Sequence, residues 1–321
     1  MSEQVLIVPS LSPGCGGQDS GNQGYLTASA MRRHLGWDAR SVVFFENYLR
    51  YDTDFVIGRN ATPQSVLDYA KDCSFFVFMD GYVDEQYLPM RQFLTPTNHC
   101  IVGVGSALRR NVHHTLMDQI TLGTKVVVPP QDESLCTTLC GVPFDFVIVD
   151  IEEIESLARE KNDEFTVCYA HTHSMLKGDD IIGRLKQDLP YIKFEEIRNM
   201  PWRKAIEAKS RCHVVLDDFV LPTYGLNVLE AGILGQHVIS RIGPWVYMIY
   251  PDFPFASVDP NCADIYDSMY DAAYDQLIAL NDAPEMWEQR LGTANQWVHD
   301  HHSSNAVANK WRWFLKWMKS Q

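Results

Sequence analysis

Two short stretches in the third quarter of the chain decide the fold: Lys177-Gly178, and then Thr223-Tyr-Gly-Leu-Asn-Val-Leu-Glu230-Ala-Gly-Ile-Leu-Gly235. The second stretch predicts a turn that leads into a helix, with Glu230 one turn inside it. The start of a helix presents unpaired backbone N–H groups and the positive end of the helix dipole, so it can hold a phosphate. A carboxylate one turn further on can accept ribose hydroxyls. With the Lys177 cation, these features indicate a nucleotide-diphosphate site.

Short apolar runs alternate with helical segments along the whole chain, for example a helix over 24–35 that stops at Gly36. The runs lack a clean period of two, which is typical of strands buried on both faces of a parallel sheet. Two doubly wound α/β domains are therefore predicted. The predicted strands are 5–8, 39–45, 75–79, 99–104, 125–128, 146–149, 165–169, 192–197, 212–216, 237–240 and 255–257.

The boundary between the two domains is expected in the acidic stretch 151–163, because one predicted strand ends at Val149 and a new strand–helix series begins at Phe165. The first domain then covers residues 1–160, and the second covers 161–303. Helices near 262–281 and 284–299 complete the second domain. A last helix is predicted over about 304–319.

Composition narrows the class of protein. A chain of 321 residues is long enough for two domains with their own cores. Forty-one acidic against 27 basic residues give a formal charge of −14, which repels phosphate backbones and makes a nucleic-acid partner unfavourable. Eight cysteines without a CxxC pair, and a start without a basic leader, predict a reducing cytoplasm. No uncharged apolar run reaches the roughly 18 residues needed to span a bilayer.

Taken together, these residues resemble the retaining glycosyltransferases of the two-domain GT-B architecture that are grouped as family 4. Members carry a Lys-Gly after a strand, and later a Glu-x-x-Gly-Leu-x-x-x-Glu-Ala turn that ends in Gly-x-Pro-Val-Ile. Residues 170–178 are similar to the first motif and 222–240 to the second. Further similar segments are the short strand that leads to an acidic residue at 208–218, the closing helices at 292–308, and the Gly-Ser-Asp-x-Arg loop at 101–109.

The resemblance implies a fold and an activity. The fold is two Rossmann-like domains that face a cleft, with the final helix, 304–321, crossing back to the N-terminal domain. The activity is transfer of a hexosyl or pentosyl group, with retention, from a UDP- or GDP-linked sugar to an acceptor hydroxyl. It also implies no tightly bound cofactor. Such chemistry relies on positioning and on electrostatic stabilisation of the departing diphosphate rather than on a strong nucleophile.

Within this resemblance, Lys177 is the expected cation for the leaving diphosphate, and Glu230 is the expected contact to the ribose. His173 and Ser174 occupy loop positions where relatives often carry an arginine, and a histidine can donate to a phosphate. The other donor contacts are expected from the second motif and from a glycine-rich loop after the first strand, namely Gly16, Gly17, Thr223, Tyr224, Gly225, Leu226 and Asn227. Simpler interpretations stay open: a solvated loop lysine, a surface glutamate and a flexible loop.

One departure from the family pattern concerns the donor sugar. Pro222 stands where relatives carry the first glutamate of the motif, which normally contacts the sugar hydroxyls. Thr223, Asp217 or Asp218 could take over that contact. Two other functions stay open: a nucleotide-sugar binding protein with little turnover, and a bacteriophage-type glycosyltransferase that modifies DNA bases, which would need a basic cleft.

The acceptor side is expected in the first domain. Asp80 at the end of a predicted strand could orient an acceptor hydroxyl, and Ser106 and Arg109 lie in the loop that is similar to the family's Gly-Ser-Asp-x-Arg. No metal site is expected, because the histidine groups at 113–114, 171–173 and 299–302 do not pair with cysteines or carboxylates at zinc spacing.

The C-terminal helix is amphipathic. Trp311, Phe314, Leu315 and Met318 follow helical spacing and are expected to pack on the protein. The remaining side is basic and aromatic, so an alternative is that it rests on an anionic membrane surface.

Overall fold

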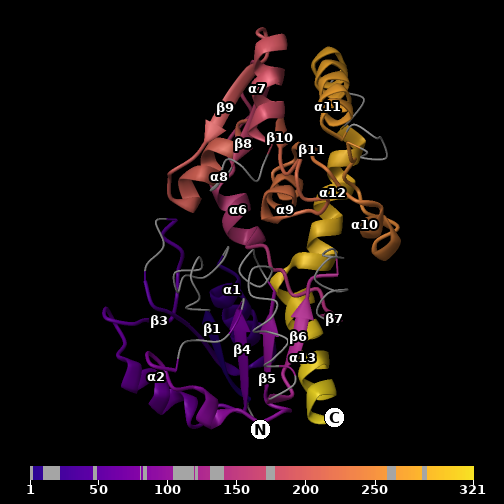
Figure 1. The fold of residues 1–321 in the computed structure, drawn as a ribbon. Helices are drawn as coiled ribbons and strands as arrows, with labels where there is room; N and C mark the ends of the chain where they lie inside the picture. Colours follow the sequence, from indigo (N-terminus) through magenta and orange to yellow (C-terminus); the bar gives the residue numbers. More distant parts are fainter. Residues whose placement is uncertain are drawn as a thin grey trace. The chain divides into compact units, whose positions relative to one another are not determined.

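The structure is a computed structural model of the chain, which divides into two compact units. Unit 1 comprises Met1–Ile148 and His301–Gln321, and unit 2 comprises Val149–Asp300. Both are drawn in Figure 1. The residues that the structure describes are 3–9, 22–45, 49–79, 81, 85–103, 119, 122–130, 141–170, 178–258, 265–283 and 288–321.

Unit 1 is built on a parallel sheet of seven strands in the order β3-β2-β1-β4-β5-β6-β7. The chain runs outward from β1 in one direction and then, from β4, in the other. The order therefore reverses between β1 and β4, as in a doubly wound fold. The strands are β1 (Gln4–Pro9), β2 (Asp38–Val43), β3 (Phe55–Val56), β4 (Phe75–Met79), β5 (His99–Val102), β6 (Lys125–Val128) and β7 (Val142–Pro143).

Alternate residues of these strands enter two separate cores. Val5 and Ile7 of β1 belong to one core, and Leu6 and Val8 belong to the other. The predicted helix over 24–35 is confirmed as α1 (Gln23–Ala30) followed by the π-helical turn η2 (Met31–Leu35), and it ends where Gly36 adopts φ 66°. Helices cover both faces, which explains why the strand sequences are apolar throughout. The other helices of this unit are α2 (Pro63–Ala70) and the short η3 (Arg91–Phe93).

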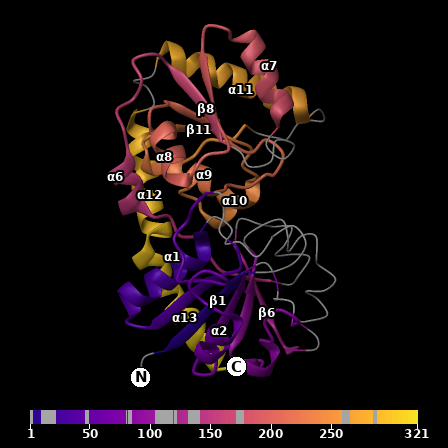
Figure 2. The same ribbon diagram turned by 90° about the vertical axis from the view of Figure 1, so that its left-hand side faces the viewer.

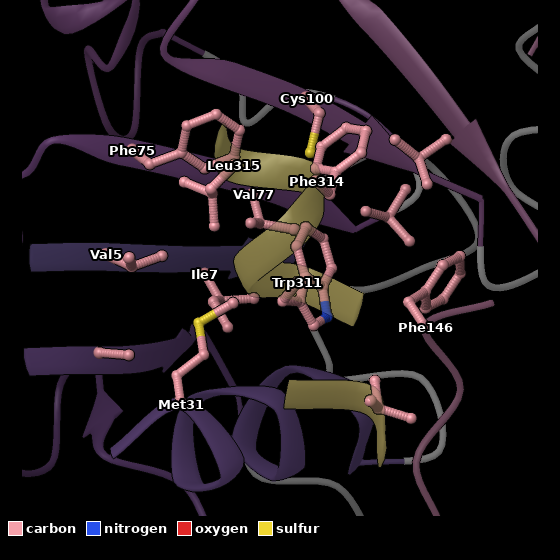
Figure 3. Packing of buried hydrophobic residues seen from close by; sticks show 14 of the residues in the cluster. Val5, Ile7, Met31, Phe75, Val77, Cys100, Phe146, Trp311, Phe314 and Leu315 are labelled. Carbon is pink, nitrogen blue, oxygen red and sulfur yellow. The ribbon is translucent and has the colours of Figure 1, made fainter. Parts of the chain in front are cut away.

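The C-terminal helix α13 (Ser304–Lys319) belongs to unit 1, which confirms that it crosses back to the N-terminal domain. Figure 3 shows Trp311 and Phe314 among strand residues such as Val77. The Trp311 ring lies 5.0 Å from that of Phe144, centroid to centroid. The apolar stripe is thus part of the core, as expected from its helical spacing. The opposite side is exposed, and 61% of Trp313 is accessible to solvent.

Two predictions for unit 1 need correction. Residues 146–149 form no strand, although Phe146 and Ile148 are buried. Their backbone groups pair with side chains instead, because the Gln23 amide both donates to and accepts from the backbone of Ile148, and His302 Nδ1 lies 2.9 Å from Val147 O. The boundary also falls before 151–163, because α6 (Ile151–Leu157) packs with unit 2, where Glu153 pairs with Arg203.

Unit 2 contains a parallel sheet of four strands in the order β11-β10-β8-β9. Helices α7 (Asp179–Asp188) and α11 (Ile265–Asp282) cover one face, where Ile182 and Ala273 share a core with Val167. Figure 2 shows these two helices side by side. The strands are β8 (Thr166–Ala170), β9 (Lys193–Ile197), β10 (Val214–Leu216) and β11 (His237–Ile239).

The remaining helices of unit 2 include α9, which packs against β10 and β11. Gly232 of α9 allows close packing on α12, because a Cβ there would lie 3.0 Å from Val298. The expected strand at 255–257 is reduced to a single bridge between Ser240 and Ser257. These helices are α8 (Trp202–Ser210), α9 (Leu226–Ile233), α10 (Pro244–Ile249) and α12 (Glu288–His302). Within the described ranges, no helix is long and apolar enough to cross a membrane.

We expect Trp311→Ala to lower the free energy of unfolding of unit 1 by about 3–5 kcal/mol, because it empties the centre of a packed core. Trp313→Ala is the matched control on the same helix, and its exposed ring should change stability by no more than about 0.5 kcal/mol. Equilibrium urea unfolding followed by circular dichroism measures both. Equal losses for the two variants would contradict the assignment of α13 to the core.

Candidate functional site

The carboxyl ends of β8 and β10 form the switch point of the unit 2 sheet. These two strands are neighbours, whereas β9 and β11, which follow them in sequence, lie on opposite sides of the pair. In open α/β sheets, ligands bind outside the carboxyl ends of strands at such a point. The chain leaves β8 toward α7 and leaves β10 toward α9, so the starts of both helices lie at this edge.

The start of α7 requires a glycine for two reasons. Gly178 caps the helix with φ 83° and ψ 44°, a left-handed conformation that other residues rarely adopt. A Cβ at this position would also lie 2.8 Å from Cβ of Phe219, the residue that follows the β10 end by three. The glycine therefore allows the start of α7 to pack closely on the loop after β10. The first turn of α7 carries Asp179 and Asp180, which complement the helix dipole without an external anion.

The start of α9 has the opposite electrostatic character. Its N-cap is Gly225, which is exposed and extended at φ −117° and ψ −172°. No side chain caps this helix, and its first turn carries no acidic residue. The dipole and the first backbone N–H groups thus favour an anion at α9 more than at α7. Leu226, which follows Gly225, is half-buried.

Asn227 connects the first turn of α9 to the ends of both switch strands. Its Nδ2 donates to the backbone oxygen of Ala170, the last residue of β8, at 3.0 Å. The same group donates to Oδ1 of Asp217, which directly follows β10, at 3.2 Å. Its Oδ1 accepts from Lys209 Nζ at 2.9 Å. The Asn227 amide therefore fixes the helix start relative to the strand ends.

Glu230 is a buried carboxylate held by two donors from α8. Trp202 Nε1 donates to its Oε1 at 2.8 Å, and Lys209 Nζ forms an ion pair with its Oε2. The Lys209 side chain is only 2% exposed, and the Glu230 side chain is 9% exposed. A carboxylate has about four lone-pair positions, so one on each oxygen is left for hydroxyl donors. The predicted ribose contact by Glu230 is compatible with this geometry.

Asp217 and Asp218 are both buried beneath the loop that leads to α9. Oδ1 of Asp218 accepts from the backbone N–H groups of Val220 and Leu221 at 3.0 and 2.8 Å, so this carboxylate shapes the loop. Pro222 is exposed, and Thr223 is half-buried. A contact from any of the three candidates to the donor sugar stays a prediction.

Tyr224 supports the turn through its ring. The side chain is 3% exposed and packs 5.0 Å from the Phe253 ring and 6.0 Å from the Trp297 ring, centroid to centroid. Tyr250 also lies against Trp297, at 5.3 Å. This aromatic cluster anchors the loop to α12 and to the segment after α10. Direct contact between Tyr224 and a donor stays a prediction.

Half of the predicted site falls outside the described residues, so those predictions stay untested. Several of these residues follow the carboxyl ends of strands at a switch point. Gly16 and Gly17 come after β1, Asp80 directly follows β4, and Lys177 comes between β8 and Gly178. The full set outside the described ranges is Gly16, Gly17, Asp80, Ser106, Arg109, His173, Ser174 and Lys177.

The sequence interpretation missed Lys209 and Trp202. A signal was present, because Trp202, Ile206 and Lys209 follow the spacing of one helix face, and Ile206 is buried. A lysine on an otherwise apolar helix face indicates a buried partner. Among the residues that the structure describes, no group of three or more His, Cys, Asp or Glu side chains could hold a metal ion.

Comparisons with known proteins place the fold. No family model matches the sequence, and no curated protein matches it either. Solved structures do match over nearly the whole chain. A glycosyltransferase from Rickettsia africae has a TM-score of 0.65 at 12% identity, with 100% of this chain and 99% of that chain covered. Anabaena HepE in complex with UDP-glucose has a TM-score of 0.60 at 10% identity, covering 98% and 99%.

A putative UDP-N-acetylglucosamine 2-epimerase from Listeria monocytogenes also matches, with a TM-score of 0.53 at 9% identity over 96% of this chain and 94% of that chain. At such low identities the likeness establishes the fold and nothing beyond it. The chain has the GT-B fold, with two Rossmann-like domains.

We expect Gly178→Ala to destabilise unit 2 by about 1–3 kcal/mol, because it forces a left-handed backbone and overlaps Phe219. Gly183→Ala is the control in the same helix: nothing lies within 4 Å of its added Cβ, so it should stabilise by about 0.5–1 kcal/mol. Thermal unfolding of both variants gives the comparison. An unchanged stability of the Gly178→Ala variant would contradict the close packing of the α7 start on Phe219, in the loop after β10.

Proposed function

We propose that this protein is a glycosyltransferase that binds a nucleotide-diphosphate sugar on unit 2, at the carboxyl ends of β8 and β10. What carries the proposal is the start of α9, which has no side-chain cap and no acidic residue in its first turn and lies at the switch point. A diphosphate supplies the anion that such a helix start favours. Glu230 lies one turn further on, where ribose hydroxyls would reach the open positions of its carboxylate.

The roles of the individual residues follow from this placement. The backbone N–H groups at Gly225, Leu226 and Asn227 stabilise the negative charge that develops on the departing diphosphate. Lys177, which directly precedes Gly178 in the sequence, supplies a cation to the diphosphate, and His173 with Ser174 supplies further donors. We propose UDP or GDP as the nucleotide, because HepE was solved in complex with UDP-glucose and the family resemblance includes both nucleotides. Transfer with retention is the outcome that the resemblance implies.

On unit 1, we propose that residues after β4 and β5 bind the acceptor hydroxyl. Asp80 is suited to orient a hydroxyl, whereas Ser106 and Arg109 are suited to an anionic group on the acceptor. These strands lie at or beside the β1–β4 switch point of the unit 1 sheet. The switch point is the place where a doubly wound sheet offers strand ends to a ligand.

Two alternatives predict different results. A binding protein with little turnover is favoured by the exposed Pro222, because its ring supplies no carboxylate to the donor sugar. A DNA-modifying enzyme is disfavoured by the net charge of −14. Sugar transfer separates the first alternative from the enzyme, and a DNA titration at several salt concentrations separates the second.

We further propose that the outer side of α13 rests on an anionic lipid surface on the cytoplasmic side of a membrane. The rings of Trp313 and Trp317 are stacked there, with centroids 6.5 Å apart and an angle of 7° between the ring planes. The exposed Arg312 and Lys316 lie beside them on the helix. Aromatic rings with basic residues are the composition of interfacial helices. Trp313→Ala and Lys316→Glu should each lower co-sedimentation with vesicles that contain phosphatidylserine. Equal sedimentation of the variants and the wild type would refute this contact.

Lys177→Ala should weaken binding of the nucleotide diphosphate by about 1.5–3 kcal/mol, the scale of a hydrogen bond to a charged group. Isothermal titration calorimetry with a panel of UDP- and GDP-sugars, with and without a chelator, measures the affinity and its independence from metal ions. Mass spectrometry of the same mixtures detects transfer. Lys204→Ala is the control, because Lys204 is an exposed lysine of unit 2 paired with Glu207. If Lys177→Ala binds the nucleotide diphosphate with unchanged affinity, the proposed role of Lys177 in this site is wrong.

A further inference from the structure

Lys209 is a lysine that the fold buries almost completely, and its ammonium lies beside the proposed donor site. Its side chain is 2% exposed. Long charged side chains are almost never buried to this degree unless they are paired, since a charge loses its hydration on burial. The pairing here is with Glu230 and Asn227, which both lie on α9. The ammonium therefore joins α8 to the first turns of the helix that we assign to the diphosphate.

The donors around Glu230 fix the direction of its carboxylate. Trp202 Nε1 holds Oε1 at 2.8 Å, and Lys209 holds Oε2. Each oxygen receives one donor from α8, so the plane of the carboxylate cannot rotate without breaking a bond to a buried partner. The backbone of Lys209 is itself anchored, because Gln236 Nε2 donates to its carbonyl oxygen at 2.6 Å.

The same ammonium also fixes the Asn227 side chain. It donates to Oδ1, which leaves Nδ2 directed at the backbone oxygen of Ala170 and at Asp217. The orientation of an amide side chain is assigned from the hydrogen bonds of its oxygen and its nitrogen. Here the donor to Oδ1 and the two acceptors from Nδ2 all indicate the same orientation. One buried cation thus orients both polar side chains of the first turns of α9.

We propose that Lys209 is a positioning residue for ribose recognition: with Trp202, it holds the Glu230 carboxylate so that one open acceptor position on each oxygen receives a ribose hydroxyl. This role rests on the proposed nucleotide-sugar site. Its consequence is a preference for ribonucleotides over their deoxy counterparts. A deoxyribose would leave the desolvated carboxylate without its second set of donors.

The test compares affinities for a ribonucleoside diphosphate and for its 2′,3′-dideoxy counterpart, with UDP or GDP chosen by the tighter binding to the wild type. The wild type should prefer the ribonucleotide by roughly tenfold to a hundredfold, the range for hydrogen bonds to a charged group. Lys209→Met and Trp202→Phe should each reduce that preference to within about threefold. Trp202→Phe should retain the wild-type affinity for inorganic pyrophosphate, because Trp202 contacts the Glu230 carboxylate and not the helix start.

The control is Lys161→Met, the same substitution at another lysine of unit 2. Lys161 Nζ donates to the backbone oxygens of Cys212 and Leu234, and burial lowers its pKa to about 8. These acceptors are backbone oxygens rather than the side chains of Glu230 and Asn227, so the ribose preference should survive the loss of Lys161. A purely structural role for Lys209 would lower stability in both lysine variants and would leave the ratio of the two affinities unchanged.

Each outcome separates the two proposals. If the wild type binds no nucleoside diphosphate, the proposed function fails. If the wild type binds the ribonucleotide and its dideoxy counterpart equally, the positioning role fails while the function stands. The same holds if a folded Lys209→Met variant keeps the full preference for the ribonucleotide. Lys209→Met leaves a buried carboxylate without its cation, so it could fail to fold. Trp202→Phe keeps an aromatic ring and removes only the N–H donor, and a full preference in that variant would equally overturn the positioning role.

Discussion

Parallel pairing in the unit 2 sheet is the constraint on which the candidate site depends. When neighbouring strands run in the same direction, their carboxyl ends and the starts of the following helices meet at one edge. Asn227 then ties the start of α9 to the ends of β8 and β10 by side-chain hydrogen bonds. One of these hydrogen bonds is accepted by the backbone oxygen of the last residue of β8. A small shift of either strand would therefore move the helix start, and Glu230 with it.

The strands could be predicted from the sequence, since a strand covered on both faces is a continuous apolar run. Phe75–Met79 and Lys125–Val128 agree with the structure residue for residue. The same signal failed at 146–149, because burial without strand pairing gives an equally apolar run. There the backbone pairs with the side chains of Gln23 and His302, which lie far away in the sequence.

The candidate site was predictable only where its residues are close in sequence. Gly225, Asn227 and Glu230 lie within one short helix start, so the pattern of a turn and a helix brought them together. Trp202 and Lys209 are 28 and 21 residues away from Glu230, and they reach it only because α8 packs on α9. Such tertiary partners leave no periodic signal beyond a polar residue on an apolar helix face.

The crossing of α13 determines the order in which the two cores can be completed. Unit 2 is a single continuous segment, whereas the core of unit 1 includes Trp311 and Phe314, which a ribosome adds only after all of unit 2. One apolar face of the seven-stranded sheet therefore stays without its α13 cover while all of unit 2 is synthesised. The N-terminal half of the chain is the later one to mature, and it is the half that depends on protection from aggregation during synthesis.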